Sequence, residues 1–374
     1  MKKGISGITS IILDILRLGA ALTVFFSHAQ DLWYPLKKHN PNEPFDGAHT
    51  AVIIFFALSG YVIALSTSNN NRGFSHYAQA RLSRLSSVLI PALLVTAIIE
   101  TCVYFLSPSL TAEFSRGFSL PRYFISGAFI NEIWFFSSAP PINRPLWSLS
   151  FEFWYYVIFG LFYFKVGGRK SLVLPILACL IAGPKILLMM PVWLLGYFAF
   201  RIPKPTIGKL GSISLSLIAF VLASLAVINL LPFPYPLGTY PFHFASQFIT
   251  DFGIGFCFAL GLWIMPAFHN VHISKQIVFY VRKWADLTFP IYVLHFPLFI
   301  LWQALFVNNP VFFNVWVAIP CVLFTCSVIG LILDKQRKYW NFFFQWLITN
   351  TKLNLEKLNG ILSNSSKVKP TYSD

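Results

Sequence analysis

The chain has 374 residues, of which 56% are hydrophobic and only 11% are charged, and its formal net charge is +15. Soluble globular domains have roughly 25% charged residues, so the composition excludes an ordinary soluble domain and indicates a surface that faces lipid. The positive charge does not require a nucleic-acid partner, because cytoplasmic loops of membrane proteins accumulate Lys and Arg; we expect membrane lipid and no nucleic acid among the partners.

Ten apolar stretches follow one another along the chain, and each is a predicted transmembrane helix. They cover residues 11–29, 50–66, 86–105, 146–164, 171–182, 187–200, 212–231, 248–268, 285–306 and 311–333. A span needs about 20 mainly apolar residues, and the fifth and sixth stretches are shorter. Pro184 and Lys185 between these two predict either a tight hairpin or a re-entrant turn, so nine to eleven spans fit the sequence. The expected fold is an all-α, polytopic bundle of about ten transmembrane helices.

The distribution of Lys and Arg predicts how these helices are oriented. With the N-terminus inside, 21 of the 28 Lys and Arg residues fall in cytoplasmic segments, six fall in outer segments and Arg17 lies within the first span. A miscounted span would invert the later loops and spoil this bias. We therefore expect an even number of spans and both chain ends in the cytoplasm. A long outer segment, residues 107–144, is expected to lie along the membrane surface or to form a partial lid.

The chain is expected to divide into a membrane domain, residues 1–334, and a cytoplasmic tail, residues 335–374. The tail begins with aromatic residues and Lys, as amphipathic helices at membrane surfaces do. It ends in a Ser/Asn/Lys stretch that is typical of disordered chain. The five cysteines lie inside apolar stretches and lack the spacing of a metal site or a disulfide framework, so no bound metal is expected.

Ionisable residues within membrane spans are costly and therefore indicate function. The first span holds Asp14, Arg17 and His28. Because Arg17 and His28 are eleven residues apart, they face within about 20° of the same direction and lie about 16 Å apart along the helix. One face thus presents a cation in the inner half and an imidazole near the outer end. The structural alternative is an Asp14–Arg17 pair that stabilises packing, with His28 at the interface.

Three later regions add charged or titratable side chains. Arg81 and Arg84 precede the third span one helical turn apart, which suits phosphate binding by forked guanidinium donors; an anchor to lipid headgroups is the alternative. Glu152 lies at the outer end of the fourth span, where it must face a cavity or a partner, and His295 lies within the ninth. A hydrogen-bonded packing role is the alternative for His295. These residues fit an enzyme whose donor carries phosphates and whose acceptor has a hydroxyl, and they fit a proton-coupled anion carrier equally well.

Five short segments stand out in chain order. They are Leu13-Asp-Ile-Leu-Arg17 with Phe26-Ser-His28, Phe55-Phe-Ala-Leu-Ser-Gly-Tyr61, Arg81-Leu-Ser-Arg84 followed by Pro91, Pro145-Leu-Trp-Ser-Leu-Ser-Phe-Glu152, and Leu287-Thr-Phe-Pro-Ile-Tyr-Val-Leu-His295. In this order they resemble the signature segments of the membrane acyltransferases of the acyltransferase-3 type, over residues 13–297. Ile15 stands where that family often has Gly, and a frequent second acid beside Glu152 is missing, so the subgroup and its substrate are not indicated.

The resemblance implies transfer of an acyl group, usually acetyl, from cytoplasmic acyl-CoA to a glycan hydroxyl at a bacterial inner membrane. Acceptors in the family include lipopolysaccharide O-antigen, exopolysaccharides and lipid-linked sugars. The stand-alone form of the family, without a soluble esterase-like domain, is expected. With this donor, Arg81 and Arg84 are expected to bind the CoA phosphates and Arg17 to orient the thioester.

The same resemblance suggests the catalytic groups. His28 is expected to act as general base on the acceptor hydroxyl or to carry the acyl group briefly, with Glu152 orienting its imidazole. His295 is a further catalytic candidate. The competing hypothesis is a transporter or flippase of a lipid-linked glycan or an anionic solute. Inverted repeats and broken helices are typical of such carriers, and the region of Pro184 is a candidate break.

Overall fold

The computed structural model describes residues 7–34, 46–69, 71–166, 168, 171–266 and 274–365, and over these ranges the protein is all-helical, as predicted. The longer helices are α1 (Gly7–Trp33), α2 (Gly47–Asn69), α3 (Phe74–Leu106), α6 (Trp147–Tyr163), α8 (Pro184–Arg201), α9 (Lys209–Asn229), α10 (Phe248–Ile264), α12 (Thr288–Phe306) and α13 (Val315–Ser365). The shorter elements are α4 (Pro108–Phe114), α5 (Ser119–Gly127), α7 (Val173–Ala182), α11 (Lys275–Asp286) and the 3-10 turns η2 (Arg144–Leu146) and η4 (His243–Ala245). No strand occurs in the described ranges.

Six helices are long and apolar enough to cross a membrane, which supports a multi-pass membrane protein. They are α1, α2, α3, α9, α12 and the first part of α13. The helices α7 and α8 meet at a bend of 115° and add a seventh span if they act as one broken span. Two more, α6 and α10, have 17 residues each, the lower limit for a span. Each of the ten predicted stretches contains helix among its described residues, but the count of about ten crossings is not confirmed, and the orientation of the chain ends stays a prediction.

The break between α7 and α8 falls at Gly183, beside the proline that suggested it. Gly183 has a φ of +81°, in the left-handed region that glycine adopts without steric cost. A Cβ at this position would lie 2.6 Å from the Cα of Trp134. Pro184, which has no backbone N–H to donate, then begins α8. The turn is therefore set both by local conformation and by close packing against the outer segment.

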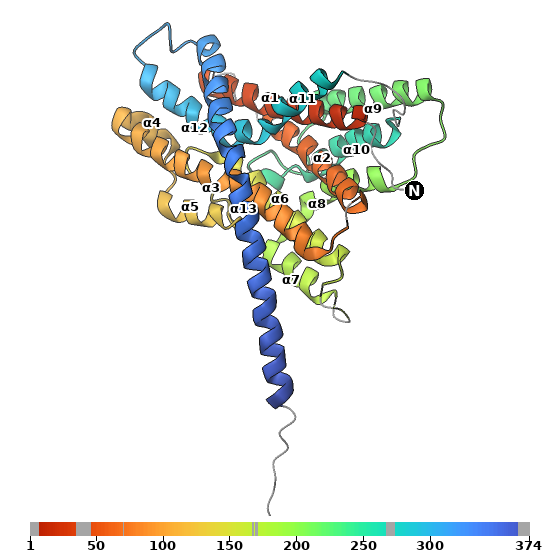
Figure 1. Ribbon diagram of the computed structural model, residues 1–374. Coiled ribbons are helices and arrows are strands. Elements are labelled where there is room, and N and C mark those ends of the chain that lie inside the picture. The colour runs from red at the N-terminus through yellow and green to blue at the C-terminus, as the bar shows by residue number, and fades with distance from the viewer. Residues whose placement is uncertain are drawn as a thin grey trace, which may run out of the picture.

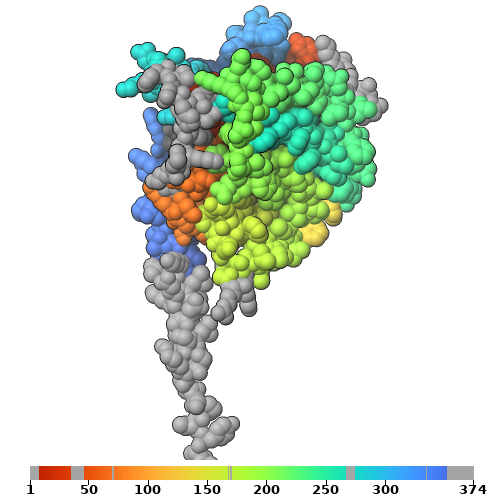
Figure 2. Space-filling view, turned by 90° about the vertical axis from the view of Figure 1, so that its right-hand side faces the viewer, coloured from red at the N-terminus to blue at the C-terminus, as the bar shows by residue number. Residues whose placement is uncertain are grey.

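Among the six helices long enough for a span, α2 and α12 are the most buried: 72% of the apolar segment is buried in each, against 28% for α9 and α13. Two glycines bring α2 and α8 into backbone contact. A Cβ on Gly60 would lie 1.9 Å from the carbonyl oxygen of Trp193, and one on Gly196 would lie 1.8 Å from that of Ala57. Small residues allow membrane helices to approach in this way. On the face that Figure 2 presents, α7 to α10 form a continuous surface in yellow-green to teal.

The predicted outer segment, residues 107–144, folds into α4 and α5 beside α3, followed by an irregular stretch (Figure 1). Ser119 and Tyr123 of α5 donate hydrogen bonds to Glu100 of α3. In the irregular stretch, Glu132 forms an ion pair with Lys185 at 2.6 Å, and both side chains are fully buried. The outer segment is thus fixed to α3 on one side and to the start of α8 on the other.

The last predicted span continues without a break into the tail. The helix α13 has 51 residues and ends at Ser365, and its C-terminal part stands away from the other helices (Figure 1). The amphipathic beginning expected for the tail therefore falls in helix. The disordered end expected for the chain includes residues 366–374, which lie outside the described residues.

Candidate functional site

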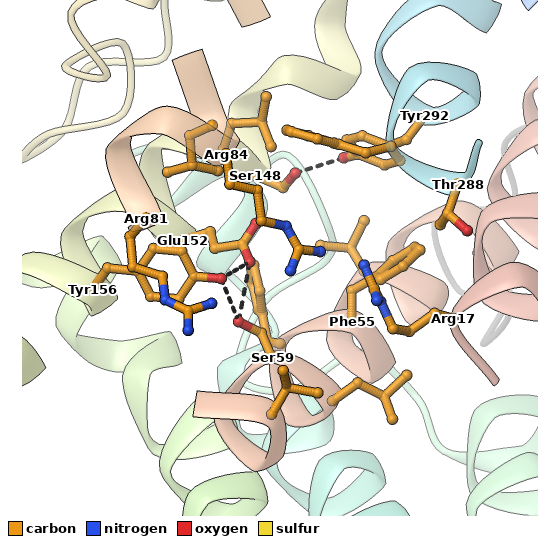
Figure 3. Close-up of a pocket in the computed structure, with 17 residues that line it drawn as sticks. Arg17, Phe55, Ser59, Arg81, Arg84, Ser148, Glu152, Tyr156, Thr288 and Tyr292 are labelled. Atoms are coloured by element: carbon orange, nitrogen blue, oxygen red, sulfur yellow. Dashed lines mark hydrogen bonds between the residues drawn. The ribbon is translucent and has the colours of Figure 1, made fainter. Parts of the chain in front are cut away.

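A cavity between α1, α2, α3, α6 and α12 gathers most of the predicted charged residues. It contains about 740 Å³ of empty space, counted with the open solvent at its mouth. Its polar wall residues are Arg17, Ser59, Arg81, Arg84, Ser148, Glu152, Tyr156, Thr288 and Tyr292 (Figure 3). Four of the six site residues predicted from the sequence are in this set, and they come from α1, α3 and α6.

Three guanidinium groups face this cavity. Arg81 and Arg84 lie one turn apart on α3, Arg17 comes from α1, and Figure 3 shows Arg84 and Arg17 pointing into the same space. Arg81 is held by a 2.8 Å hydrogen bond to Oγ of Ser66 and by the ring of Tyr156, 5.7 Å from the guanidinium carbon. Among the described residues, no hydrogen bond or ion pair engages the Arg84 side chain. Arg84 is therefore the cation best placed to bind a ligand.

Arg17 also forms the pair that the sequence suggested as a packing interaction. Its Nη1 lies 3.8 Å from Oδ1 of Asp14. Even so, Arg17 lines both the main cavity and an adjoining hollow, which it shares with Arg84, Asp286 and Arg337. The arginine-lined space therefore extends from the cavity toward α11 and α13.

Glu152 supplies the carboxylate of the cavity wall. It accepts a 3.0 Å hydrogen bond from Ser59 and a short one from Tyr156, and Trp193 donates to Ser59 at 3.2 Å. Against this one carboxylate the wall has three guanidinium groups, so it carries a net positive charge that suits phosphate oxygens. The sequence suggested that Glu152 orients His28, but none of these bonds reaches that imidazole.

Tyr292 and His295 lead from the cavity toward the end of α1. The hydroxyl of Tyr292 donates to the carbonyl of Pro145 at 2.7 Å and lies 2.6 Å from Oγ of Ser148. One turn later His295 is fully buried, with its ring centre 6.2 Å from that of Tyr292. Its Nδ1 lies 3.0 Å from the carbonyl oxygen of Ile291 and therefore carries the proton. Its Nε2 has no hydrogen-bond partner among the described residues and is left as a free acceptor.

His28 stacks on His295. The two ring centres are 5.4 Å apart and the ring planes differ by 18°, while Phe296 makes an edge-on contact with His28 at 5.1 Å. The carboxylate beside His28 is Asp31, with 3.6 Å between Nδ1 and Oδ2, and the His28 side chain remains 21% exposed. The end of α1 thus holds a partly exposed imidazole with an acid partner on one side and a buried imidazole on the other.

The six predicted residues form two groups. The three arginines share the cavity with Glu152, and the two histidines stack beyond it. Asp31 and Tyr292 were not predicted, although helical spacing could have found both. Asp31 comes three residues after His28, and Tyr292 comes three before His295, so each pair shares a helix face.

Titratable side chains elsewhere in the described structure form smaller groups. Nε2 of His49 in α2 lies 2.9 Å from Oδ2 of Asp251 in α10, and both side chains are buried. The other oxygen of Asp251 accepts a hydrogen bond from Gln247 at 3.0 Å. This pair joins α2 to α10 near the site. Among the described residues, no group of three or more His, Cys, Asp or Glu side chains is placed to hold a metal ion.

Comparisons with known proteins point in one direction. The sequence model of the family described as "Acyltransferase domain" matches residues 11–334. A protein of Shigella phage Sf6 named O-acetyl transferase is 28% identical over 183 residues, which cover 44% of this chain and 49% of the relative. The chain therefore matches about half the length of that relative. No solved structure matches.

Proposed function

Because the chain belongs to the acyltransferase-3 family, we propose that it transfers an acyl group from cytoplasmic acyl-CoA to a hydroxyl of a surface glycan or a lipid-linked sugar. The observation that carries this proposal is the convergence of Arg17, Arg81 and Arg84 on one cavity inside a membrane-type helix bundle. A donor with several phosphates suits such a wall. The name of the phage relative, O-acetyl transferase, favours acetyl as the transferred group.

The donor phosphates bind at the arginines in this proposal. Arg84 makes the first contact, because no other described side chain competes for its donors. Arg81 is held in place by Ser66 and Tyr156 and adds a second forked donor. Arg17 borders both the cavity and the adjoining hollow. In this proposal it lies at the point of the bound donor where the phosphates end and the arm that carries the thioester begins.

His28 acts as the general base. It accepts the proton of the acceptor hydroxyl, whose oxygen bonds to the thioester carbonyl carbon. The carbon–sulfur bond breaks, and the CoA thiolate takes up a proton to leave as the thiol. Asp31 beside Nδ1 keeps the proton of the neutral imidazole on that nitrogen, so that Nε2 is the base. The 3.6 Å separation is long for a hydrogen bond, as catalytic bonds in unliganded sites often are.

Tyr292 and His295 stand in a row between the cavity and His28. The acyl group can reach His28 from the cavity by two routes. In the first, the thioester arm extends past α12 to the acceptor. In the second, an imidazole displaces the CoA thiolate and carries the acyl group as an acyl-imidazole, from which the acceptor hydroxyl then takes it. Both routes end at His28.

The experiment that tests the proposal measures radiolabel from acetyl-CoA in the glycolipid and polysaccharide fractions of membranes that contain the protein. Label is expected with the unaltered protein and is lost in Arg84→Ala and in His28→Ala. No label in any glycan fraction, with folded protein and a broad set of acceptors, would overturn acyl transfer to a glycan.

One observation favours the carrier alternative, a transporter or flippase of a lipid-linked glycan or anionic solute. The helices α7 and α8 form a broken pair bent by 115°, and broken helices are typical of transporter binding sites. Among the described helices this is the one bent pair that is together long and apolar enough for a span, whereas inverted repeats place breaks in both halves. Movement of a labelled lipid-linked glycan across proteoliposomes without acyl-CoA would favour the carrier.

A further inference from the structure

The helix α12 contains a proline at position 297, in the part that contacts the end of α1. Proline has no backbone N–H, so Pro297 cannot donate the hydrogen bond that would close a helical turn onto the carbonyl of Val293, four residues earlier. The residues inside this turn include His295 and Phe296, whose ring centres lie 5.4 Å and 5.1 Å from that of His28. The part of α12 that contacts the proposed base therefore lacks one of its own hydrogen bonds.

Asn143, near the end of the outer segment, supplies the missing donor. Its Nδ2 lies 2.9 Å from the carbonyl oxygen of Val293 and 3.0 Å from Oγ1 of Thr96 in α3. The Asn143 side chain is fully buried. A buried carbonyl without a hydrogen bond is costly, so the bond from Asn143 takes the place of the one that Pro297 cannot make.

The two partners of Asn143 settle which end of its amide faces α12, since the hydrogen-bond network decides that assignment. The carbonyl of Val293 can only accept a hydrogen bond. Thr96 donates its own hydroxyl hydrogen to the carbonyl of Ala92 at 2.7 Å, so its oxygen accepts from Asn143. Both contacts thus need the amide nitrogen, and Oδ1 has no hydrogen-bond partner among the described residues. A buried unpaired acceptor opposes stability, which a role in packing alone does not require.

A second contact fixes the same part of α12 to the same turn of the chain. The hydroxyl of Tyr292, the neighbour of Val293, donates to the carbonyl of Pro145 at 2.7 Å. It also lies 2.6 Å from Oγ of Ser148 (Figure 3). Asn143 and Pro145 are two residues apart, in the turn that leads into α6. Two successive residues of α12 are therefore held by one short turn, next to the helix that supplies a wall of the cavity.

We propose that Asn143 is a positioning residue for acyl transfer. By holding the carbonyl of Val293, it fixes the turn of α12 in which His295 stacks on His28. This inference rests on the proposed function, in which His28 accepts the proton of the acceptor hydroxyl. Asn143 touches neither donor nor acceptor in this role and acts only through α12.

The role predicts a loss of turnover and not of donor binding. Asn143→Leu keeps the approximate size of the side chain and removes both donors, so the carbonyl of Val293 loses its partner. The measurement is transfer of radiolabel from acetyl-CoA to the glycolipid and polysaccharide fractions of membranes that contain the protein. We expect kcat to fall about tenfold or more, because a small displacement of a catalytic group has a cost of this size. The KM for acetyl-CoA should stay unchanged, because the arginines that bind the donor come from α1 and α3.

A double-mutant cycle separates positioning from a general loss of packing. Pro297→Ala restores a backbone N–H that can bond to the carbonyl of Val293. In that background Asn143→Leu should lower kcat much less than it does in the unaltered protein. Thr96→Val is the matched control, because it disturbs the same buried cluster but leaves the bond from Asn143 to α12 in place. It is expected to keep its kcat even where the unfolding temperature in detergent falls.

The cycle also covers the case in which Asn143→Leu alone does not fold. The double variant Asn143→Leu/Pro297→Ala should then fold, because the carbonyl of Val293 again has a donor. Failure of this double variant, while Pro297→Ala alone folds, would show that the bond to Val293 is not what Asn143 supplies.

Three further results would overturn the inference. They are an unchanged kcat in folded Asn143→Leu, equal losses of kcat from this substitution in both backgrounds, and a raised KM for acetyl-CoA with kcat unchanged. With label transfer by the unaltered protein intact, each of these removes the positioning role and leaves the proposed function standing. No transfer by the unaltered protein to any glycan fraction overturns the proposed function and the positioning role together.

Discussion

The imidazole of His28 in α1 stacks on that of His295 in α12, with 5.4 Å between the ring centres. One ring is partly exposed beside Asp31, and the other is fully buried with an unpaired Nε2. Tyr292, one turn before His295, lines the arginine cavity. The stack therefore links the two ends of a site whose parts, Arg17 and His28, lie about 16 Å apart along α1.

Replacing His28 with Ala is expected to lower acyl transfer by about 10²–10⁴-fold, the usual contribution of a general base. The side chain is partly exposed, so the variant should fold. The measurement is the rate of label transfer from acetyl-CoA, with the unfolding temperature in detergent as a check. His76→Ala, at a half-buried position on α3, is the matched control with full activity. Full activity in His28→Ala would rule out His28 both as the general base and as the group that briefly holds the acyl group.

Replacing Asp31 with Asn is expected to lower kcat while leaving the KM for acetyl-CoA unchanged. Asp31 lies beside the imidazole and away from the arginines that bind the donor in our proposal, so its loss affects proton transfer and not donor binding. Glu152→Gln should instead change the KM for acetyl-CoA and leave kcat unchanged, because Glu152 lies among the arginines of the cavity. The measurement is steady-state kinetics with both substrates varied. A rise in the KM for acetyl-CoA alone in Asp31→Asn would contradict this division of roles.

The longer helices were predictable because ten apolar stretches are interrupted by polar ones, and each stretch contains helix in the described structure. The short helices α4 and α5 and most of α11 fall outside those stretches. Whether each helix crosses the membrane was less predictable. Lys185 illustrates the reason: its place between the fifth and sixth predicted spans puts it in an outer loop, yet its side chain is buried in an ion pair with Glu132. Length and hydropathy do not reveal such pairs, which arise only when distant segments pack together.

The same limit applies to the site. The spacing of Arg81 and Arg84 on one helix predicted a cation pair, and the structure brings Arg17 and Glu152 to it from other helices. The hydrogen bond from Ser59 to Glu152 crosses from α2 to α6 and has no sequence signal, because it depends on how those helices pack.

Replacing Arg84 with Ala is expected to raise the KM for acetyl-CoA at least tenfold, since a charge-assisted hydrogen bond to phosphate is worth about 1.5–3 kcal/mol. Arg84→Lys should recover only part of the loss, because Lys lacks the forked donor geometry. The measurement is initial rate against acetyl-CoA concentration at two salt concentrations. Arg201→Gln on α8 serves as the charge-matched control. An unchanged KM in Arg84→Ala would remove this residue from the donor site.

Replacing Glu132 with Gln is expected to destabilise the protein by about 3–5 kcal/mol, because it leaves the buried ammonium group of Lys185 without a counter-charge. The pair is 2.6 Å long and fully buried. Removing both charges in Glu132→Gln/Lys185→Met should restore much of the stability. The measurement is the unfolding temperature in detergent. A double variant less stable than Glu132→Gln alone would show that the pair is not the source of the loss.

Replacing Gly60 with Ala is expected to separate α2 from α8 and to lower stability by about 1–3 kcal/mol, the usual cost of overpacking. The added methyl would meet the backbone carbonyl oxygen of Trp193 at 1.9 Å, and backbone cannot move aside as a flexible side chain can. Ser59, the neighbour of Gly60, bonds to Glu152, so activity should fall as well. Gly253→Ala in α10 is the matched control, because nothing lies within 4 Å of the added atom. There the better helix propensity of Ala should preserve or raise the unfolding temperature. Equal unfolding temperatures for the two variants would mean that the contact between α2 and α8 is looser than the structure indicates.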